Sequence, residues 1–213
     1  KTLKVNTSVL NLQPGDEINV SAWKGNEKVT EEKNLDTSVT LKINDPEVWS
    51  PSHPFLYDLK VTVMRKGKVV DEVKSYFAMR KISIAPDKNG IQKMMLNNAF
   101  LFEFGPLDQG WWPDGLYTAP TDAALKFDIE KTKEMGFNMI RKHIKVEPAR
   151  WYYYCDMLGM LVWQDMPSGD LGNHWENRPG VLGRATDRER TPESEGYYRK
   201  EWNEIIDALY NYP

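Results

Sequence analysis

Two short stretches, Gly136-Phe137-Asn138-Met139-Ile140 and Gly159-Met160-Leu161-Val162-Trp163, decide the fold class of the second half of the chain. Each places a glycine directly before a run of mostly apolar residues, long enough for one buried strand. The two glycines lie 159 − 136 = 23 residues apart, which leaves room for one helix between the strands. The repeat therefore predicts strands that alternate with helices, a pattern typical of a parallel sheet.

The helices of this pattern have recognisable ends. Thr121 or Asp122 can cap a helix that Gly136 ends, and Pro148 stands at the favoured first turn of the next one. The apolar positions of the three expected helices are Leu125, Ile129 and Met135, then Trp151, Tyr154, Cys155 and Leu158, then Trp202, Ile205, Ile206 and Leu209. With a first strand at 99–102, this makes three strands and three helices. A closed (β/α)₈ barrel needs eight strands, so we expect either a small open α/β domain or the first part of a barrel.

Residues 1–85 have a different period. Apolar residues alternate with polar ones, which is typical of antiparallel strands with one buried face. About seven short strands in this length fit an immunoglobulin-like sandwich. We therefore predict a boundary between residues 85 and 86. The positions expected to face the core are Leu3, Val5, Val9, Ile18, Val20, Ala22, Val39, Leu41, Ile43, Tyr57, Leu59, Val61, Val63, Val73, Ser75, Phe77, Ile82 and Ile84.

Composition excludes several classes of protein. The 213 residues carry 28 Lys and Arg against 31 Asp and Glu, a net charge of −3, without a basic block, so we expect no nucleic-acid partner. Apolar runs fall short of the ~18–20 residues that cross a bilayer, and we expect neither a signal peptide nor membrane association. One cysteine allows no internal disulfide, and the three histidines match no zinc spacing. The sequence thus predicts no metal and no cofactor.

Several motifs resemble those of family 2 glycoside hydrolases. Residues 45–57, with Trp49-Ser50-Pro51, are similar to a signature in that family's immunoglobulin-like middle domain, and residues 76–82 to the exit from it. Leu96-Asn97-Asn98 resembles the turn before the first barrel strand, with Asn98 in place of glycine. The longest resemblance runs from Asp128 to Pro167. Its matching positions are Asp128, Lys133, Gly136, Asn138, Ile140, Arg141, Cys155, Asp156, Gly159, Met160, Leu161 and Val162.

The resemblance implies a multidomain chain, with an all-β immunoglobulin-like sandwich over 1–85 and the N-terminal portion of a (β/α)₈ TIM barrel over 86–213. It implies a fragment of a retaining exo-β-glycosidase acting on terminal β-linked sugars. β-Galactosidase is the first expectation, and β-mannosidase and β-glucuronidase are the alternatives. By the same resemblance, we expect a bacterial periplasmic or secreted parent enzyme. The family's two catalytic glutamates lie at the ends of strands four and seven, so we expect no catalytic residue here and an inactive fragment.

Six residues are candidates for substrate binding because they follow the expected strands, where barrel enzymes place their sites. They are Asp108, Trp111, Trp112, Arg141, His143 and Asp165. Trp111 and Trp112 either stack on a sugar or only pack their loop. Arg141 orients a substrate or a carboxylate, or forms a salt bridge at the rim. Asp165 hydrogen-bonds a sugar hydroxyl, pairs with Arg141, or does both. Family members usually place their histidine three residues after the arginine, whereas His143 is two after Arg141.

Two other functions remain open. The aromatic residues and the missing carboxylate pair also suit a carbohydrate-binding module without catalysis, and the sandwich also suits a structural scaffold. An incomplete sheet has an unpaired edge, so self-association of the open half barrel is expected. Phe102, Ile140 and Trp163 should then keep apolar surface exposed.

Overall fold

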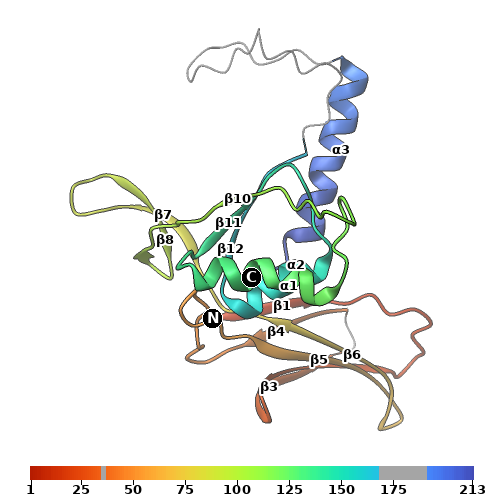
Figure 1. Ribbon diagram of the computed structural model, residues 1–213. Helices are drawn as coiled ribbons and strands as arrows, with labels where there is room; N and C mark the ends of the chain where they lie inside the picture. Colours follow the sequence, from red (N-terminus) through yellow and green to blue (C-terminus); the bar gives the residue numbers. More distant parts are fainter. Residues whose placement is uncertain (35–36, 168–190) are drawn as a thin grey trace, which may run out of the picture. The chain divides into compact units, whose positions relative to one another are not determined.

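The computed structural model describes residues 1–34, 37–167 and 191–213 (Figure 1). The strands are β1 (Thr2–Asn6), β2 (Glu17–Lys24), β3 (Glu27–Asn34), β4 (Ser38–Lys42), β5 (Tyr57–Arg65), β6 (Lys68–Phe77), β7 (Ile82–Pro86), β8 (Gln92–Leu96), β9 (Ala99–Phe100), β10 (Leu107–Asp108), β11 (Met139–Lys142) and β12 (Leu161–Gln164). The helices are α1 (Asp122–Glu134), α2 (Ala149–Leu158) and α3 (Pro192–Leu209).

The chain forms two compact units. Unit 1 takes residues 1–103 with 153–161 and 213, and unit 2 takes 104–152 with 162–212. The last six residues of α2 therefore fold with unit 1.

Two antiparallel sheets of unit 1 surround one apolar core. The larger sheet has the strand order β3-β2-β5-β6, and β1 pairs with β4 in the smaller one. Alternate residues of β2 and β4 supply most of the core, as the period-two pattern predicts. The buried cluster is Ile18, Val20, Ala22, Val39, Leu41, Ile43, Tyr57 and Phe77.

Four positions predicted to face this core are wrong, and two of them, Val73 and Ser75, are exposed on β6. Val73 is 57% exposed, because β6 is the edge strand of its sheet and only its end, at Phe77, reaches the core. Ile82 and Ile84 are also exposed. They lie on β7, which pairs with β8 in a separate sheet of order β7-β8-β9, so the pairing crosses the boundary predicted at residue 85.

The predicted first strand of the parallel sheet, 99–102, is also wrong. Ala99–Phe100 is β9, antiparallel to β8, and Leu107–Asp108 instead pairs in parallel with β11. The turn before β9 explains the difference. Asn97 and Asn98 both have positive φ, at 53° and 68°, and turn the chain straight back onto β8. This confirms that Asn98 can replace glycine there.

Trp49 and Asp156 tie the C-terminal part of α2 to the strands of unit 1. The Trp49 side chain is fully buried, and its indole N–H donates to the Asp156 backbone carbonyl at 2.8 Å. The Tyr76 hydroxyl donates to the Asp156 carboxylate, also at 2.8 Å. Burial raises the pKa of Asp156 to about 7, against the opposing effects of Tyr76 and Arg80. Unit 1 thus contains a carboxyl group that folding keeps partly out of water.

Unit 2 contains the sheet β10-β11-β12, whose strands lie side by side (Figure 1). Thr121 is the N-cap of α1, and its hydroxyl accepts a hydrogen bond from the Ala124 N–H at 3.0 Å. Leu125 and Ile129 of α1 are buried, as are Met139 and Ile140 of β11. The expectation that Ile140 keeps exposed surface is therefore wrong, because Met139 and Ile140 point to opposite faces of β11 and both are buried.

Helix α3 begins at the N-cap Thr191 and has no fully buried side chain. Ile205 and Leu209 are half-buried, whereas Trp202 and Ile206 are exposed. In the part of the chain that the structure describes, no helix is both long and apolar enough to cross a membrane.

Candidate functional site

Arg141 and Asp165 meet across neighbouring strands of unit 2. Arg141 lies on β11 and Asp165 directly follows β12. Arg141 Nε and Nη2 donate to the two Asp165 carboxylate oxygens at 3.0 and 2.9 Å. This bidentate pair holds the carboxylate in one orientation. The predicted Arg141–Asp165 pairing is confirmed.

His143 joins the same carboxylate from the end of β11. Its Nδ1 lies 3.0 Å from Asp165 Oδ2, and its backbone N–H donates to the Asp108 carbonyl at 2.9 Å. His143 is half-buried. Its ring is held at Nδ1 by Asp165, and Nε2 is the second ring nitrogen. Two predicted residues, Arg141 and His143, therefore both contact a third, Asp165.

The electrostatics of this cluster decide what Asp165 can do. Hydrogen bonds from Arg141, and after them His143, hold the pKa of Asp165 below its usual range despite some desolvation. Asp165 is therefore ionised at neutral pH and acts as a hydrogen-bond acceptor. A general acid in glycoside hydrolysis needs the opposite, a carboxyl group whose pKa is raised.

Asp108 is half-buried and lies in a second cluster, whose other charged side chains are buried. Its Oδ2 accepts from Lys142 Nζ at 2.5 Å, and its Oδ1 accepts from the Gly110 N–H at 2.7 Å. Lys142 is 1% exposed and also contacts Glu147 Oε1 at 2.9 Å. Its ammonium lies 4.4 Å from the centre of the Trp151 ring. The Asp108 carboxylate is thus occupied by protein donors rather than turned to solvent.

Lys145 completes the second cluster. Its ammonium contacts Glu147 Oε1 at 3.0 Å and donates to the carbonyls of Gly110 and Tyr117 at 2.7 and 2.8 Å. Lys142, Lys145 and Glu147 were not predicted. An available signal was the position of Lys142 two residues after buried Ile140, because alternate residues of a strand share one face.

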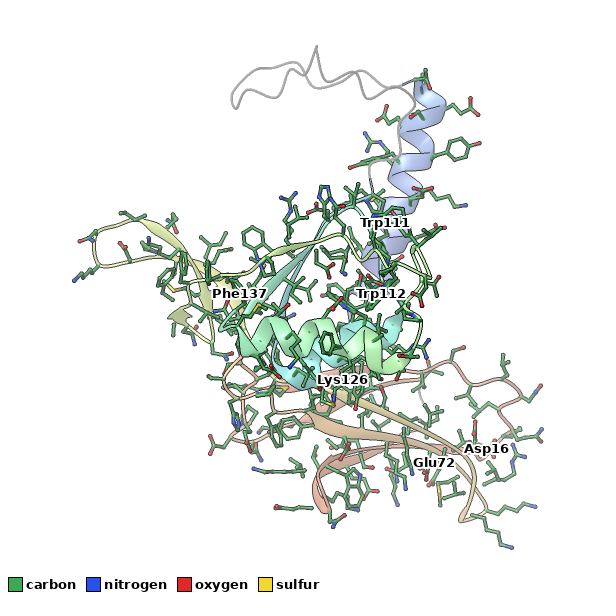
Figure 2. The ribbon with its side chains drawn as sticks, viewed as in Figure 1. Asp16, Glu72, Trp111, Trp112, Lys126 and Phe137 are labelled. Carbon is green, nitrogen blue, oxygen red and sulfur yellow. The ribbon has the colours of Figure 1, made fainter. Side chains whose placement is uncertain are left out.

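The two predicted tryptophans differ in their surroundings. Trp111 is 55% exposed and its ring meets that of Tyr117 edge to face, whereas Trp112 is half-buried. The backbone of Trp112 pairs with Leu116 through hydrogen bonds of 2.7 and 2.9 Å. Figure 2 labels both tryptophans on the loop after β10. Tyr117 is the aromatic residue of this loop that the sequence analysis missed.

The described residues hold no group of three or more His, Cys, Asp and Glu side chains placed to bind a metal ion. Two carboxyl groups of unit 2, at Asp108 and Asp165, are each bound to a cation. The arrangement offers hydrogen-bonding side chains and exposed aromatic rings to a ligand.

Comparison with known proteins decides the family. The model of "Glycosyl hydrolases family 2" matches residues 1–80. A putative beta-glucuronidase of Formosa agariphila is 30% identical over 179 residues, which cover 80% of this chain and 18% of that protein. The chain belongs to glycosyl hydrolase family 2. A beta-galactosidase of Lactococcus lactis is 30% identical over 119 residues, 55% of this family 2 chain and 11% of that enzyme.

A solved structure agrees with this family 2 assignment at the level of fold. The FMN-binding beta-glucuronidase from Faecalibacterium prausnitzii L2-6 superposes with a TM-score of 0.77 at 22% identity. The superposition covers 100% of this chain and 30% of that one. The chain thus spans under a third of the length of each relative. Residues 1–80 end at strand β6 and the short segment after it, so the family match does not itself reach the clusters of unit 2.

Proposed function

We propose that this family 2 chain is part of a retaining exo-β-glycosidase that removes terminal β-linked sugars. The observation that carries the proposal is the cluster of Arg141, His143 and Asp165 at the ends of two neighbouring strands. Relatives named as beta-galactosidases and beta-glucuronidases support the same class. β-Galactosidase is the first candidate activity, with β-glucuronidase and β-mannosidase as the alternatives.

In this proposal, the cluster binds the sugar and does not break the glycosidic bond. The ionised Asp165 accepts a hydrogen bond from a sugar hydroxyl, while Arg141 fixes the direction of its lone pairs. His143 offers its second ring nitrogen to a neighbouring hydroxyl. Trp111 supplies an apolar ring surface. Asp108 positions the loop that follows it through Gly110, and Trp112 packs that loop.

The catalytic carboxyl groups are proposed to lie outside this chain. A retaining mechanism needs two carboxyl groups about 5–5.5 Å apart, one a nucleophile and one an acid with raised pKa. Asp165 has a lowered pKa and Asp108 is paired with Lys142. Neither residue therefore suits the role of the general acid.

The fold proposal accompanies the function. Residues 86–213 would be the N-terminal portion of a (β/α)₈ barrel, supported by the parallel pairing of β10 with β11. Residues 1–85 would be a separate immunoglobulin-like domain, supported by a core cluster that lies wholly between Ile18 and Phe77. Expression of residues 1–85 alone should then give one cooperative thermal transition. Loss of that transition would contradict the domain assignment.

The activity is tested with the longest reading frame that contains residues 1–213. That protein should release nitrophenol from the β-galactoside, β-glucuronide or β-mannoside, and proton NMR should show the β-anomer as first product. The 213-residue chain alone should be inactive. Asp165→Asn in the longer protein should lower kcat/KM by about 10²-fold, since misplaced groups cost that much. Release of the α-anomer, or activity of the short chain after repurification, would overturn the proposal.

A second candidate function is carbohydrate binding without catalysis, which the exposed ring of Trp111 favours. If the longer protein binds a glycoside but hydrolyses none of the three substrates, this candidate replaces the first.

Self-association is a further part of the proposal. Leu107 and Trp163, on β10 and β12, are 49% and 45% exposed. Apolar side chains on an incomplete sheet favour pairing of two copies. Sedimentation velocity over a concentration series should show a dimer of the 213-residue chain. A monomer at all concentrations would contradict this.

A further inference from the structure

One buried lysine closes the loop that carries the exposed aromatic rings of unit 2. The Lys145 side chain is 5% exposed and its ammonium donates to the carbonyls of Gly110 and Tyr117. These two carbonyls stand at the two ends of the segment 110–117, which we name the ring loop. Lys145 therefore joins both ends of the ring loop at one point, just after β11.

The charge of Lys145 is balanced inside the protein. Glu147 Oε1 lies 3.0 Å from Lys145 Nζ and 2.9 Å from Lys142 Nζ, and the Glu147 side chain is 3% exposed. The fit around Gly110 is close. Its φ is +65°, and a Cβ there would lie 2.4 Å from Glu147 Oε1 and 2.8 Å from Lys145 Nζ. Glycine is thus required for the loop to reach the ammonium.

The ring loop contributes little to the core of unit 2. Trp111 is 55% and Tyr117 48% exposed, and Leu116 is exposed as well. Removing an ammonium and a carboxylate from water is unfavourable, so burying them in order to fix an exposed loop is unusual for stability alone. The cluster instead gives the two rings a single position, as a binding surface needs.

The rings themselves form a corner. Their centroids lie 4.4 Å apart and their planes are inclined by 76°. Lys145 Nζ lies 5.1 Å from the centre of the Tyr117 ring and so fixes that ring from one side. The ring loop is also joined to the cluster of Arg141, His143 and Asp165 through Asp108. The Asp108 carboxylate accepts from the Gly110 N–H, and its backbone carbonyl accepts from the His143 N–H.

We propose that Trp111 and Tyr117 together form the stacking surface for a pyranose ring, and that Lys145 is the positioning residue that sets it. Trp112, with which Trp111 was first paired, is not part of this surface. The C–H bonds on one face of a pyranose carry partial positive charge and suit the negative face of an aromatic ring. The inference rests on the proposed function, since a β-glycoside is the ligand.

The test labels the 213-residue chain with 5-fluorotryptophan and follows the fluorine NMR signals. Trp111→Phe and Trp112→Phe assign the two resonances. Methyl β-D-galactopyranoside and methyl β-D-glucuronide are the probes, added to about 50 mM because one stacked ring gives millimolar affinity. The Trp111 resonance should shift and saturate with at least one probe, and the Trp112 resonance should stay in place.

Three variants separate positioning from stability. Tyr117→Ala should abolish the shift of Trp111. Lys145→Met should raise Kd by about tenfold or more, because the two rings lose their fixed geometry. Leu125→Ala is the matched control, since it weakens the buried face of α1 without touching the ring loop, and it should keep the original Kd. Dispersed signals of buried Trp49 and Trp151 report that each variant is folded.

Each outcome decides the inference. A Trp111 signal that no probe moves overturns the stacking surface, even if the longer protein hydrolyses glycosides. Equal weakening by Lys145→Met and Leu125→Ala overturns the positioning role. If Lys145→Met fails to fold, an unchanged Kd in Tyr117→Ala still refutes the corner. A saturable Trp111 shift in a protein without hydrolase activity supports this inference while the proposed function fails.

Discussion

The centres of the two units are built from opposite kinds of side chain. Unit 1 packs eight apolar residues between two sheets, from Ile18 on β2 to Phe77 on β6. Unit 2 also has apolar residues under α1, but the space beside β11 holds the charged side chains of Lys142, Lys145 and Glu147. All three are less than 10% exposed.

Unit 1 is therefore stabilised by burial of apolar side chains, whereas contacts between buried charges set the arrangement of unit 2 beside β11. Apolar packing is non-directional, and it tolerates exchange of one side chain for another of similar volume. Buried ion pairs are directional and become unfavourable when one partner is lost. The charged centre of unit 2 therefore fixes the positions of Asp108 and the ring loop more strictly than apolar residues would.

The largest expected effect is at Lys142. Lys142→Ala should destabilise unit 2 by about 3–5 kcal/mol, because Asp108 and Glu147 lose a cation that they share in a buried site. Native-state hydrogen exchange, followed on the backbone amides of β11, measures this loss.

A second pair of variants sharpens the comparison. Leu41→Ala in unit 1 should cost about 2–5 kcal/mol from the cavity that it leaves. Adding Asp108→Asn to Lys142→Ala should recover part of the stability lost in Lys142→Ala, because it removes an uncompensated charge. The apolar core around Leu41 offers no second substitution of this kind. Additive losses in the double variant would show that the buried charges of unit 2 act independently.

The next effect is a pH dependence within unit 1. The pKa of Asp156 is raised from 3.8 to about 7, so the folded state binds a proton that the unfolded state releases. This stabilisation is complete below pH 3.8 and is lost as the pH rises through 7. Between pH 5 and 8 the loss amounts to at most about 3 kcal/mol, one proton changing ΔG by ~1.4 kcal/mol per pH unit.

Asp156→Asn tests the origin of this dependence. The amide stays neutral at every pH and can still accept from Tyr76, so unit 1 should lose most of the slope. Urea unfolding at pH 5 and 8, followed by circular dichroism, gives the two free energies. The same slope in the variant would assign the titration to other groups.

The smallest effect is at the start of α1. Thr121→Ala removes the side-chain acceptor for the Ala124 N–H and should cost about 1 kcal/mol. Thr121→Ser keeps the acceptor and is the matched control. If both variants lose the same stability by urea unfolding, the hydroxyl does not contribute as a cap.

Local sequence signals predicted the elements better than the pairings. The N-cap at Thr121, the helix end at Gly136 and the turn at Asn97-Asn98 follow from the conformations that these side chains allow. The strand at 99–102 was wrong, because an isolated apolar run cannot show which neighbour it will pair with. The exposed faces of β6 and β7 were missed for the same reason.

The sequence by itself determined the alternation in residues 1–85, the helix–strand repeat after residue 90 and the residue types at the strand ends. Arg141, His143 and Asp165 were found because each follows or ends an apolar strand. These signals act over a few residues, where side-chain period and backbone preference are sufficient.

Only the tertiary structure decided which of these groups touch. It selected the Arg141–Asp165 pair, across 24 positions of sequence, among the alternatives that the sequence left open. It buried Lys142 and Lys145 around Glu147, and it gave Trp111 and Trp112 different surroundings. It also placed Tyr117 against Trp111. Contacts between distant positions depend on strand order and on the desolvation of charges, and neither is encoded in the local pattern of any one segment.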